Sequence, residues 1–263
     1  MKLCLLGAIW GDICGVPYEF SPERDAKKLD LNHPEQTFSD DTVLTLAVAK
    51  AILEKRPYRD VIAELALQYP DRGFGGMFYR EWIAKQNPVP YNSFGNGSAM
   101  RVSPVAWAFN TVDDVLREAE ATAACSHNHP LGIAAAQATA LAIFLARKGQ
   151  DKETIREVIE ERFDYPLTDD LELLRADALE VGFDETWVSV PQAISAFLAT
   201  DSFEDCLRET IALGCDADTQ AAISCAIAEA YYGVEKSLKA RVKSFLPPTL
   251  QKILDAFANR YGV

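Results

Sequence analysis

The sequence predicts an all-α protein that folds as a single domain over residues 1–263. Apolar residues recur at three- and four-residue spacing in several long segments, and these segments are rich in alanine, which favours closely packed helices. No segment shows the convincing alternation of apolar and polar residues that is typical of β-strands. With 49% apolar and 25% charged residues, a chain of 263 residues can bury a substantial core.

The first expected element lies near the N-terminus, where Gly7, Gly11 and Gly15 recur on one helix face. Glycine costs a helix interior about 1 kcal/mol relative to alanine, so three such positions imply a packing reason. Close approach of a second helix along this face would supply that reason. Asp12 lies in the same apolar run, and it is either solvated or buried with a polar partner.

The same periodicity predicts further helices along the chain. They are expected over Val43–Leu53, Val61–Tyr69, Leu131–Ala146, Ala193–Ala199 and Ala217–Tyr232, with a short amphipathic helix after Pro247 and Pro248. The longest irregular stretch runs from Pro70 to Ser103, and its aromatic residues argue against disorder. Irregular stretches of this length in compact domains are usually functional, so we expect this one to line a site.

Charge and cysteine content narrow the functional classes. A formal net charge of −13 should repel nucleic acids and anionic lipids, so an anionic ligand needs a bound cation or glycine-loop N–H groups. No segment reaches the roughly 20 uncharged apolar residues of a membrane span, and no secretory signal is visible. None of the six cysteines forms a C-x-x-C pair, so we expect reduced, mostly buried thiols. A cytoplasmic protein without a membrane partner is expected.

Two acidic clusters stand at the beginnings of predicted helices. Ser39-Asp40-Asp41-Thr42 precedes one helix, and Gly214-Cys215-Asp216-Ala217-Asp218-Thr219 precedes another. Taken singly, each cluster is explained by N-capping and by the helix dipole. Taken together, they contain more carboxylates than capping requires, and four facing carboxylates would repel one another unless cations were present. Oxygen donors select hard cations such as Mg²⁺, Mn²⁺ or Ca²⁺.

Two glycine-rich segments could present backbone N–H groups to a diphosphate. One is Arg72-Gly73-Phe74-Gly75-Gly76-Met77, and the other is Asn92-Ser93-Phe94-Gly95-Asn96-Gly97-Ser98. Either phenylalanine could offer its ring to adenine, although each segment alone is also explained as a turn. Cys125, His127 and His129 do not match the spacing of a common zinc site, so a capped loop before the Leu131 helix is the simpler interpretation.

The ordered set of these motifs resembles the ADP-ribosylglycohydrolase family. The resemblance runs from about Gly7 to Gly233, and it is carried by the following motifs: Gly11-Asp12 with Glu19, Ser39-Asp40-Asp41-Thr42, Asn96-Gly97-Ser98-Ala99-Met100-Arg101, His127-Asn128-His129-Pro130 and Gly214-Cys215-Asp216-Ala217-Asp218-Thr219. Ser39 stands where the family usually has threonine, which keeps the hydroxyl oxygen. Cys215 stands where glycine is common, so the backbone there can differ.

The resemblance implies an orthogonal bundle of helices with two Mg²⁺ or Mn²⁺ ions in a central cleft. Carried onto this chain, the implied metal ligands are Glu19, Ser39, Asp40, Asp41, Asp216, Asp218 and Thr219. The expected substrate contacts are Gly73, Phe74, Gly75, Phe94, Gly95, Asn96, Gly97, Ser98, Met100 and His127. The implied activity is hydrolysis of the glycosidic bond of an ADP-ribosyl adduct, on a protein or on a small molecule.

The expected chemistry needs a positioned water at the anomeric carbon and a residue that accepts its proton. Glu19 is the preferred base, with Asp40 as the alternative. Three other interpretations remain: a catalytically silent ADP-ribose-binding module, a His-Asp type phosphohydrolase and a helical interaction protein without a site. No histidine precedes an aspartate here, which argues against the phosphohydrolase. The group linked to ADP-ribose stays open; a nucleic-acid adduct is possible but not indicated.

Overall fold

The computed structural model of the chain describes residues 3–180 and 186–263, and this part is helical and contains no β-strand. The predicted all-α class is therefore confirmed. The helices are α1 (Leu6–Gly15), η1 (Val16–Tyr18), α2 (Asp40–Glu54), α3 (Tyr58–Gln68), α4 (Gly76–Phe78), η2 (Tyr79–Ala84), η3 (Asn96–Ser98), α5 (Ser103–Ala108), α6 (Val112–Ala124), α7 (Pro130–Arg147), α8 (Lys152–Phe163), α9 (Leu171–Glu180), α10 (Thr186–Leu198), α11 (Phe203–Ile211), α12 (Ala217–Tyr232), α13 (Lys236–Phe245) and α14 (Pro248–Tyr261).

The glycine face of α1 packs directly on the backbone of α12. A β-carbon added to Gly7 would lie 2.1 Å from the carbonyl oxygen of Cys225, and one added to Gly11 would lie 2.2 Å from that of Ala221. Gly15 leaves equally little room. These distances are far below van der Waals contact, so only glycine allows the two helices to lie this close. The predicted packing reason for the glycines is confirmed.

The start of α1 is capped by a residue of α12 instead of by a neighbour in sequence. Leu5 precedes α1 in the left-handed conformation, with φ 66°, and its side chain provides no cap. The Gly7 backbone N–H donates to Oε2 of buried Glu229 over 2.8 Å. A carboxylate at a helix N-terminus satisfies free N–H groups and complements the helix dipole. Glu229 therefore ties the beginning of α1 to the last turns of α12.

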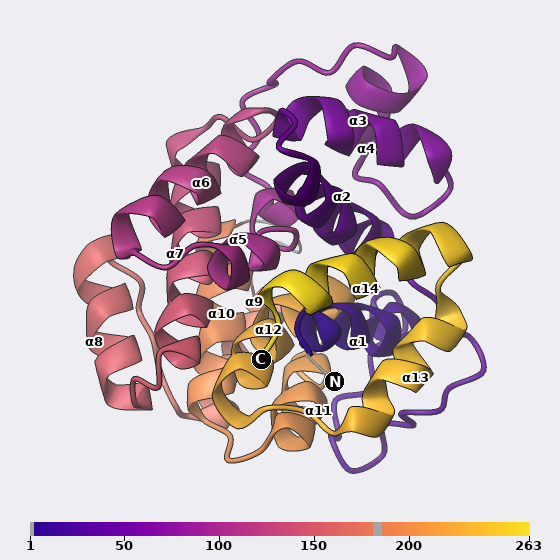
Figure 1. Cartoon of the computed structure of the whole chain (residues 1–263). Helices are drawn as coiled ribbons and strands as arrows, with labels where there is room; N and C mark the ends of the chain where they lie inside the picture. Colours follow the sequence, from indigo (N-terminus) through magenta and orange to yellow (C-terminus); the bar gives the residue numbers. More distant parts are fainter. Residues whose placement is uncertain (1–2, 181–185) are drawn as a thin grey trace.

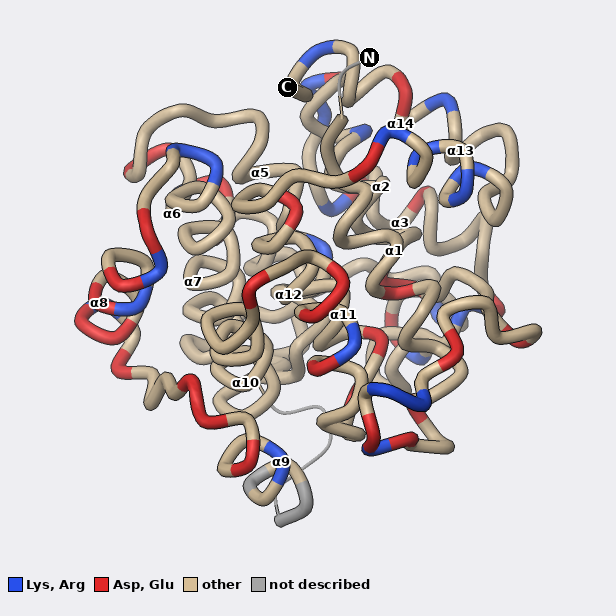
Figure 2. Tube along the Cα trace, turned by 90° about the horizontal axis from the view of Figure 1, so that it is seen from below, with Lys and Arg blue, Asp and Glu red and all other residues tan. Residues whose placement is uncertain are grey.

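α7 and α10 pack against the other sides of α12 and complete the centre of the bundle. α7 is long and apolar enough to pass the composition test for a membrane span, but 61% of that window is buried inside the bundle. The apolar surface of α7 is thus used mainly for packing between helices. In Figure 2, charged segments gather on peripheral elements such as α8, whereas α7 and α10 are tan for most of their length.

Segments from both ends of the chain meet beside α1. Figure 1 shows α13 and α14 near α1, with the two termini close together. Backbone hydrogen bonds join Leu3 to Val263 in both directions, over 3.1 and 3.3 Å. α2 packs against α14 and α1, which brings the beginning of α2 next to the α1–α12 pair. This arrangement positions the acidic helix starts described below.

The predicted helices are all present, and several extend beyond their predicted bounds. α10 begins at Thr186 and contains Pro191 in its interior. The structure also contains α6, α8, α9, α11 and α13, which the periodicity did not single out. The stretch predicted to be irregular, Pro70 to Ser103, includes the short helices α4, η2 and η3. Phe78 of α4 and Trp82 of η2 bury their rings in the core.

The cysteines of the chain are free thiols. Five of them are buried, and Cys125 is partly buried. This agrees with the prediction of reduced, mostly buried thiols in a fold held together by apolar packing.

Candidate functional site

The beginning of α2 presents the first acidic cluster. Ser39 is the N-cap residue, and its hydroxyl accepts a hydrogen bond from the Asp41 backbone N–H over 3.1 Å. The same hydroxyl donates to Oδ2 of Asp41 over 3.1 Å. The capping explanation is therefore correct for Ser39 but does not account for both aspartates. Oδ1 of Asp41 is buried and has no hydrogen-bond partner among the described residues.

The beginning of α12 presents the second cluster. Asp216 occupies the N-cap position without a side-chain capping bond, and its Oδ2 accepts instead from Nδ2 of Asn96 over 2.7 Å. Asp218 and Thr219 lie in the first turn and are buried. Capping thus does not explain Asp216, whose carboxylate turns toward the η3 segment. Asn96, from a glycine-rich segment, becomes part of the acidic site.

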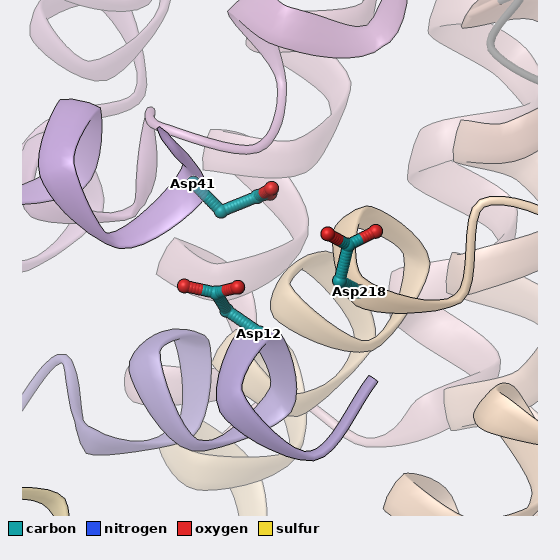
Figure 3. Close-up of side chains that lie close together, drawn as sticks. All are labelled: Asp12, Asp41 and Asp218. Atoms are coloured by element: carbon teal, nitrogen blue, oxygen red, sulfur yellow. The ribbon is translucent and has the colours of Figure 1, made fainter. Parts of the chain in front are cut away.

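The two helix starts converge, although 178 positions separate them in the sequence. The Thr219 hydroxyl donates to Oδ2 of Asp41 over 3.2 Å. Figure 3 shows Asp41 at the start of α2, Asp218 at the start of α12 and Asp12 on α1 pointing toward one another. Carboxylate oxygens of these three aspartates lie within 4.8 Å of one another. The expected meeting of the two acidic helix starts is confirmed.

Asp12 connects α1 to the start of α2. Its carboxylate is completely buried and accepts hydrogen bonds from the backbone N–H of Ser39, at 3.1 and 3.2 Å, and of Thr42, at 3.1 Å. The Thr42 hydroxyl also donates to it. Of the two possibilities for Asp12, burial with polar partners is the one observed. With its acceptor sites largely used, Asp12 chiefly positions the neighbouring acids.

A second group of three carboxylates shares Asp218 with the first. Glu19, which follows η1, lies with Asp216 and Asp218 so that oxygens of all three fall within 4.8 Å. Glu19 is half-buried and faces the cavity. Without the family resemblance, nothing in the sequence marks Glu19 as a site residue, because it is a single glutamate shortly after Pro17. The fold brings Glu19 to the acidic site because η1 packs against α12.

Burial and mutual repulsion disfavour the ionised forms of these acids in the absence of cations. Burial raises the pKa of Asp12 and of Asp216 to about 6. Burial, reinforced by Asp218 and Asp12, raises the pKa of Glu19 to about 8. The pKa values of the other three acids, Asp40, Asp41 and Asp218, are raised well above the usual range by burial and by the neighbouring carboxylates.

The donor set fits hard divalent cations. The side chains that converge here offer carboxylate and hydroxyl oxygens, and the unpartnered Oδ1 of Asp41 is a free acceptor in a buried position. Mg²⁺ and Mn²⁺ prefer oxygen ligands, whereas structural zinc sites use cysteine and histidine. A cation among these oxygens would compensate both their burial and their repulsion.

The acids lie in a cavity of about 690 Å³. All seven residues expected as metal ligands line it, as do seven of the ten expected substrate contacts. The expected residues found in the lining are Glu19, Ser39, Asp40, Asp41, Asp216, Asp218, Thr219, Gly73, Gly75, Gly95, Asn96, Gly97, Met100 and His127. The Pro70–Ser103 stretch supplies a large part of this wall, as its composition predicted.

Three expected substrate contacts lie outside this lining. Phe74 is buried and stacks on Phe78, with ring centroids 5.2 Å apart, so its face is used in packing. Ser98 is fully buried, and its hydroxyl donates to the Gly132 carbonyl over 2.7 Å. Phe94 is 41% exposed and packs beside Trp187.

The lining also contains residues that the sequence interpretation did not name as contacts. Arg72 lies over the Phe38 ring, 3.8 Å from its centroid, and Tyr91 packs beside His127. Arg101 reaches the cavity from a fully buried position. Arg101 ends one of the motifs that carry the family resemblance, which is the signal that could have identified it.

The two histidines near Cys125 have separate surroundings. His127 is buried and lines the cavity. His129 is the N-cap residue of α7, and its Nδ1 accepts from the Leu131 N–H over 3.1 Å. The capped loop expected before the Leu131 helix is confirmed.

Known proteins that are similar to this chain indicate its family. A model of the ADP-ribosylglycohydrolase family matches residues 1–262. The chain is 28% identical to ADP-ribosylhydrolase ARH3 of Mus musculus, over 89% of this chain and 84% of that protein. It is 26% identical to ADP-ribosyl-[dinitrogen reductase] glycohydrolase of Rhodospirillum rubrum, over 88% of this chain and 84% of that protein.

A solved structure supports the fold. A chain of an ADP-ribosylglycohydrolase-related protein complex superimposes with a TM-score of 0.71 at 22% identity, covering 97% of this chain and 95% of the other. At this identity the likeness concerns the fold. The family model, which matches residues 1–262, shows the family: the chain belongs to the ADP-ribosylglycohydrolase family.

Proposed function

We propose that the protein is a metal-dependent hydrolase that cleaves the glycosidic bond of an ADP-ribosyl adduct and releases ADP-ribose. The observation that carries the proposal is the convergence of two acidic helix starts on one cavity, in a chain of this family. A cavity of about 690 Å³ falls within the range of roughly 300–1,000 Å³ that is common for small-molecule sites.

Two divalent cations, Mg²⁺ or Mn²⁺, are proposed as cofactors. The residues that would hold them are Glu19, Ser39, Asp40, Asp41, Asp216, Asp218 and Thr219. Two groups of three carboxylates that share Asp218 support a pair of ions over a single one. Bound there, the ions would supply Lewis-acid orientation of the ribose hydroxyls and a water of lowered pKa.

Glu19 is the proposed base. Its carboxylate lines the cavity and is only half-buried, so it can reach a water above the buried acids. In the metal-free protein the pKa of Glu19 is raised to about 8, in part by the nearby charge of Asp218. A cation bound to Asp218 would offset that charge and would lower the pKa of Glu19 toward the range of a base that works near neutral pH. Asp40 also lines the cavity and is the alternative.

The part of the cavity wall formed by the glycine-rich segments is proposed to bind the rest of the ADP-ribosyl group. The glycine segments there expose backbone beside the acids: a β-carbon on Gly73 would lie 3.6 Å from Oδ1 of Asp40, and Gly75 has open space around it. Such backbone can approach phosphate oxygens closely. The names of the mouse and bacterial relatives support an ADP-ribosyl substrate.

The proposal is tested with a panel of defined ADP-ribosylated compounds, linked through arginine, serine, an acetyl ester or a nucleobase. Release of ADP-ribose is measured by chromatography with Mg²⁺, with Mn²⁺ and with excess chelator. We expect release from at least one compound, loss of release with chelator and recovery when the cation is restored. Tight binding of ADP-ribose without release from any compound would indicate the silent binding module instead.

A further inference from the structure

His127 is the last member of a chain of buried hydrogen bonds. Nη2 of Arg101 donates to the Ser126 hydroxyl oxygen over 2.7 Å and to the Thr122 carbonyl over 2.8 Å. The Ser126 hydroxyl oxygen lies 2.8 Å from Nδ1 of His127. Arg101, Ser126 and Thr122 are completely buried, and His127 is 5% exposed. Because water has little access to these groups, each polar atom needs its partner within the protein.

The donors and acceptors of this hydrogen-bond network favour one position for the proton of the His127 imidazole. A guanidinium can only donate, so the Ser126 oxygen accepts from Arg101. The Ser126 hydroxyl has one hydrogen, and Nδ1 of His127 lies 2.8 Å from its oxygen, where it can accept that hydrogen. A nitrogen that accepts is unprotonated, and the hydrogen of a neutral imidazole must then be on Nε2.

The surroundings also keep the ring neutral. Burial, together with the charge of nearby Arg101, holds the pKa of His127 well below its usual range. No carboxylate forms an ion pair with Arg101 among the described residues, and its Nε and Nη1 are buried without partners. A buried positive charge without a counter-ion favours an anionic ligand close by.

The Nε2 edge of the ring faces the cavity next to Gly97. A β-carbon on Gly97 would lie 3.0 Å from Nε2 and 3.1 Å from Cε1. No hydrogen bond joins Nε2 to another of the described residues, and both His127 and Gly97 line the cavity. Because Gly97 has no side chain, the Nε2 edge of the ring is left open to a ligand.

We propose that Arg101 and Ser126 are positioning residues that hold His127 as the neutral Nε2–H tautomer, so that it donates a hydrogen bond to a phosphate oxygen of the bound ADP-ribosyl group. This inference rests on the proposed function, because it takes the ADP-ribosyl group as the occupant of the cavity. It adds to the proposed function the tautomer of His127 that contacts the ligand and the two residues, Arg101 and Ser126, that fix this tautomer.

The tautomer is measured directly by two-bond ¹H–¹⁵N correlation on protein labelled at histidine nitrogens. The chain contains three histidines, and the His127→Gln variant identifies the signals of His127. We expect a protonated Nε2 and an unprotonated Nδ1 in the wild-type protein. In Ser126→Ala, which removes the hydroxyl donor, we expect Nδ1 to show partial protonation, and Ser126→Thr should restore the wild-type pattern.

Binding is measured by calorimetry with ADP-ribose and Mg²⁺. Loss of one neutral hydrogen bond corresponds to roughly a three- to tenfold increase in Kd, which we expect for Ser126→Ala and not for Ser126→Thr. Gly97→Ala provides a second variant, since its methyl group would cover Nε2 while leaving the Ser126 contact in place. It should weaken binding without changing the tautomer. A metal-dependent rise in Tm in each variant shows that the site still folds.

Two results would overturn the inference: a protonated Nδ1 in the wild-type protein, or an unchanged Kd for ADP-ribose in both Ser126→Ala and Gly97→Ala. Failure of the proposed function looks different. In that case ADP-ribose binds and the variants weaken it as expected, but no adduct of the panel is cleaved.

Discussion

Asp218 is the residue on which the site depends most, because it belongs to both groups of three carboxylates. We expect Asp218→Asn to lower turnover by more than about a hundredfold. Loss of a residue that only hydrogen-bonds to a metal ligand typically costs about 10- to 100-fold in activity, and loss of the ligand itself should cost more. Metal-free stability should stay the same or rise, because the change removes a buried carboxyl whose pKa is raised well above its usual range. Turnover and calorimetric unfolding in chelator test both statements.

The matched control for Asp218 is Asp113→Asn. Asp113 is exposed in the first turn of α6 and does not line the cavity. The Asp113→Asn variant should have unchanged turnover. Substantial activity in Asp218→Asn would contradict the two-ion proposal.

Glu19 should respond differently from Asp218, because it is proposed as the base and lies at the edge of the acid cluster. Glu19→Gln keeps an oxygen for a cation but cannot accept the proton, so we expect turnover to fall by about 10²- to 10⁴-fold. The rise in Tm on adding Mg²⁺ should persist at more than half its wild-type size. Exposed Glu35→Gln serves as the control. If Glu19→Gln retains wild-type turnover, Asp40 becomes the candidate base.

Residues differed in how far the sequence could predict them. Asp41, Asp216 and Asp218 were predictable, since acids at these helix starts exceed what capping needs. Asp12 was not, because an acid in an apolar helix is explained equally well by solvation. What decides its role is contact with Ser39 and Thr42, which belong to another helix.

The contact between α1 and α12 is the element-level feature that holds the acids in place. We expect Gly11→Ala to destabilise the protein by about 1–3 kcal/mol or more, because the new β-carbon would meet the Ala221 carbonyl at 2.2 Å. Denaturant unfolding measures the change. Gly76→Ala, where no atom lies within 4 Å of the added carbon, should change stability far less. Equal stability of the two variants would mean that α1 shifts at little cost.

Helices were predictable where a broad apolar face runs along many residues, and they were missed where that face is narrow or the helix is short. α12 begins and ends at its predicted residues because nearly every side of it is buried. α8 carries many charged residues and buries only Ile155 and Ile159, so its apolar periodicity is weak. α11 has a clear buried face at Cys206, Leu207, Thr210 and Ile211, but it is only nine residues long. Their N-caps, Asp151 and Ser202, were the local signal available.

At the scale of the whole molecule, the acid cluster should make stability depend on pH and on cations together. The folded pKa values are about 6 for Asp12 and Asp216 and about 8 for Glu19, all above the unfolded values near 4. A raised folded pKa contributes stability that is complete below the unfolded pKa and is lost as pH rises through the folded one. Metal-free Tm should therefore fall between about pH 4 and pH 8.

Added Mg²⁺ should oppose this fall, because cations bind the ionised acids. We expect a larger rise in Tm on adding Mg²⁺ at pH 8 than at pH 5.5, measured by differential scanning calorimetry at fixed ionic strength. At a hundred times its Kd, a cation stabilises the folded state by about 2.7 kcal/mol. A Mg²⁺ effect that is the same at both pH values would show that the acids do not bind the ion.

The distance along the chain between Asp41 and Thr219 also has a kinetic consequence. Oxygens contributed by residues 178 positions apart come together only after most of the backbone has assembled, so early intermediates offer Mg²⁺ no binding site. A ligand that recognises only the finished structure lowers the rate of unfolding and leaves the rate of refolding unchanged. Stopped-flow measurements across a denaturant series should show a slower unfolding limb with Mg²⁺. Faster refolding with the ion would mean that these distant segments meet before the rate-limiting barrier.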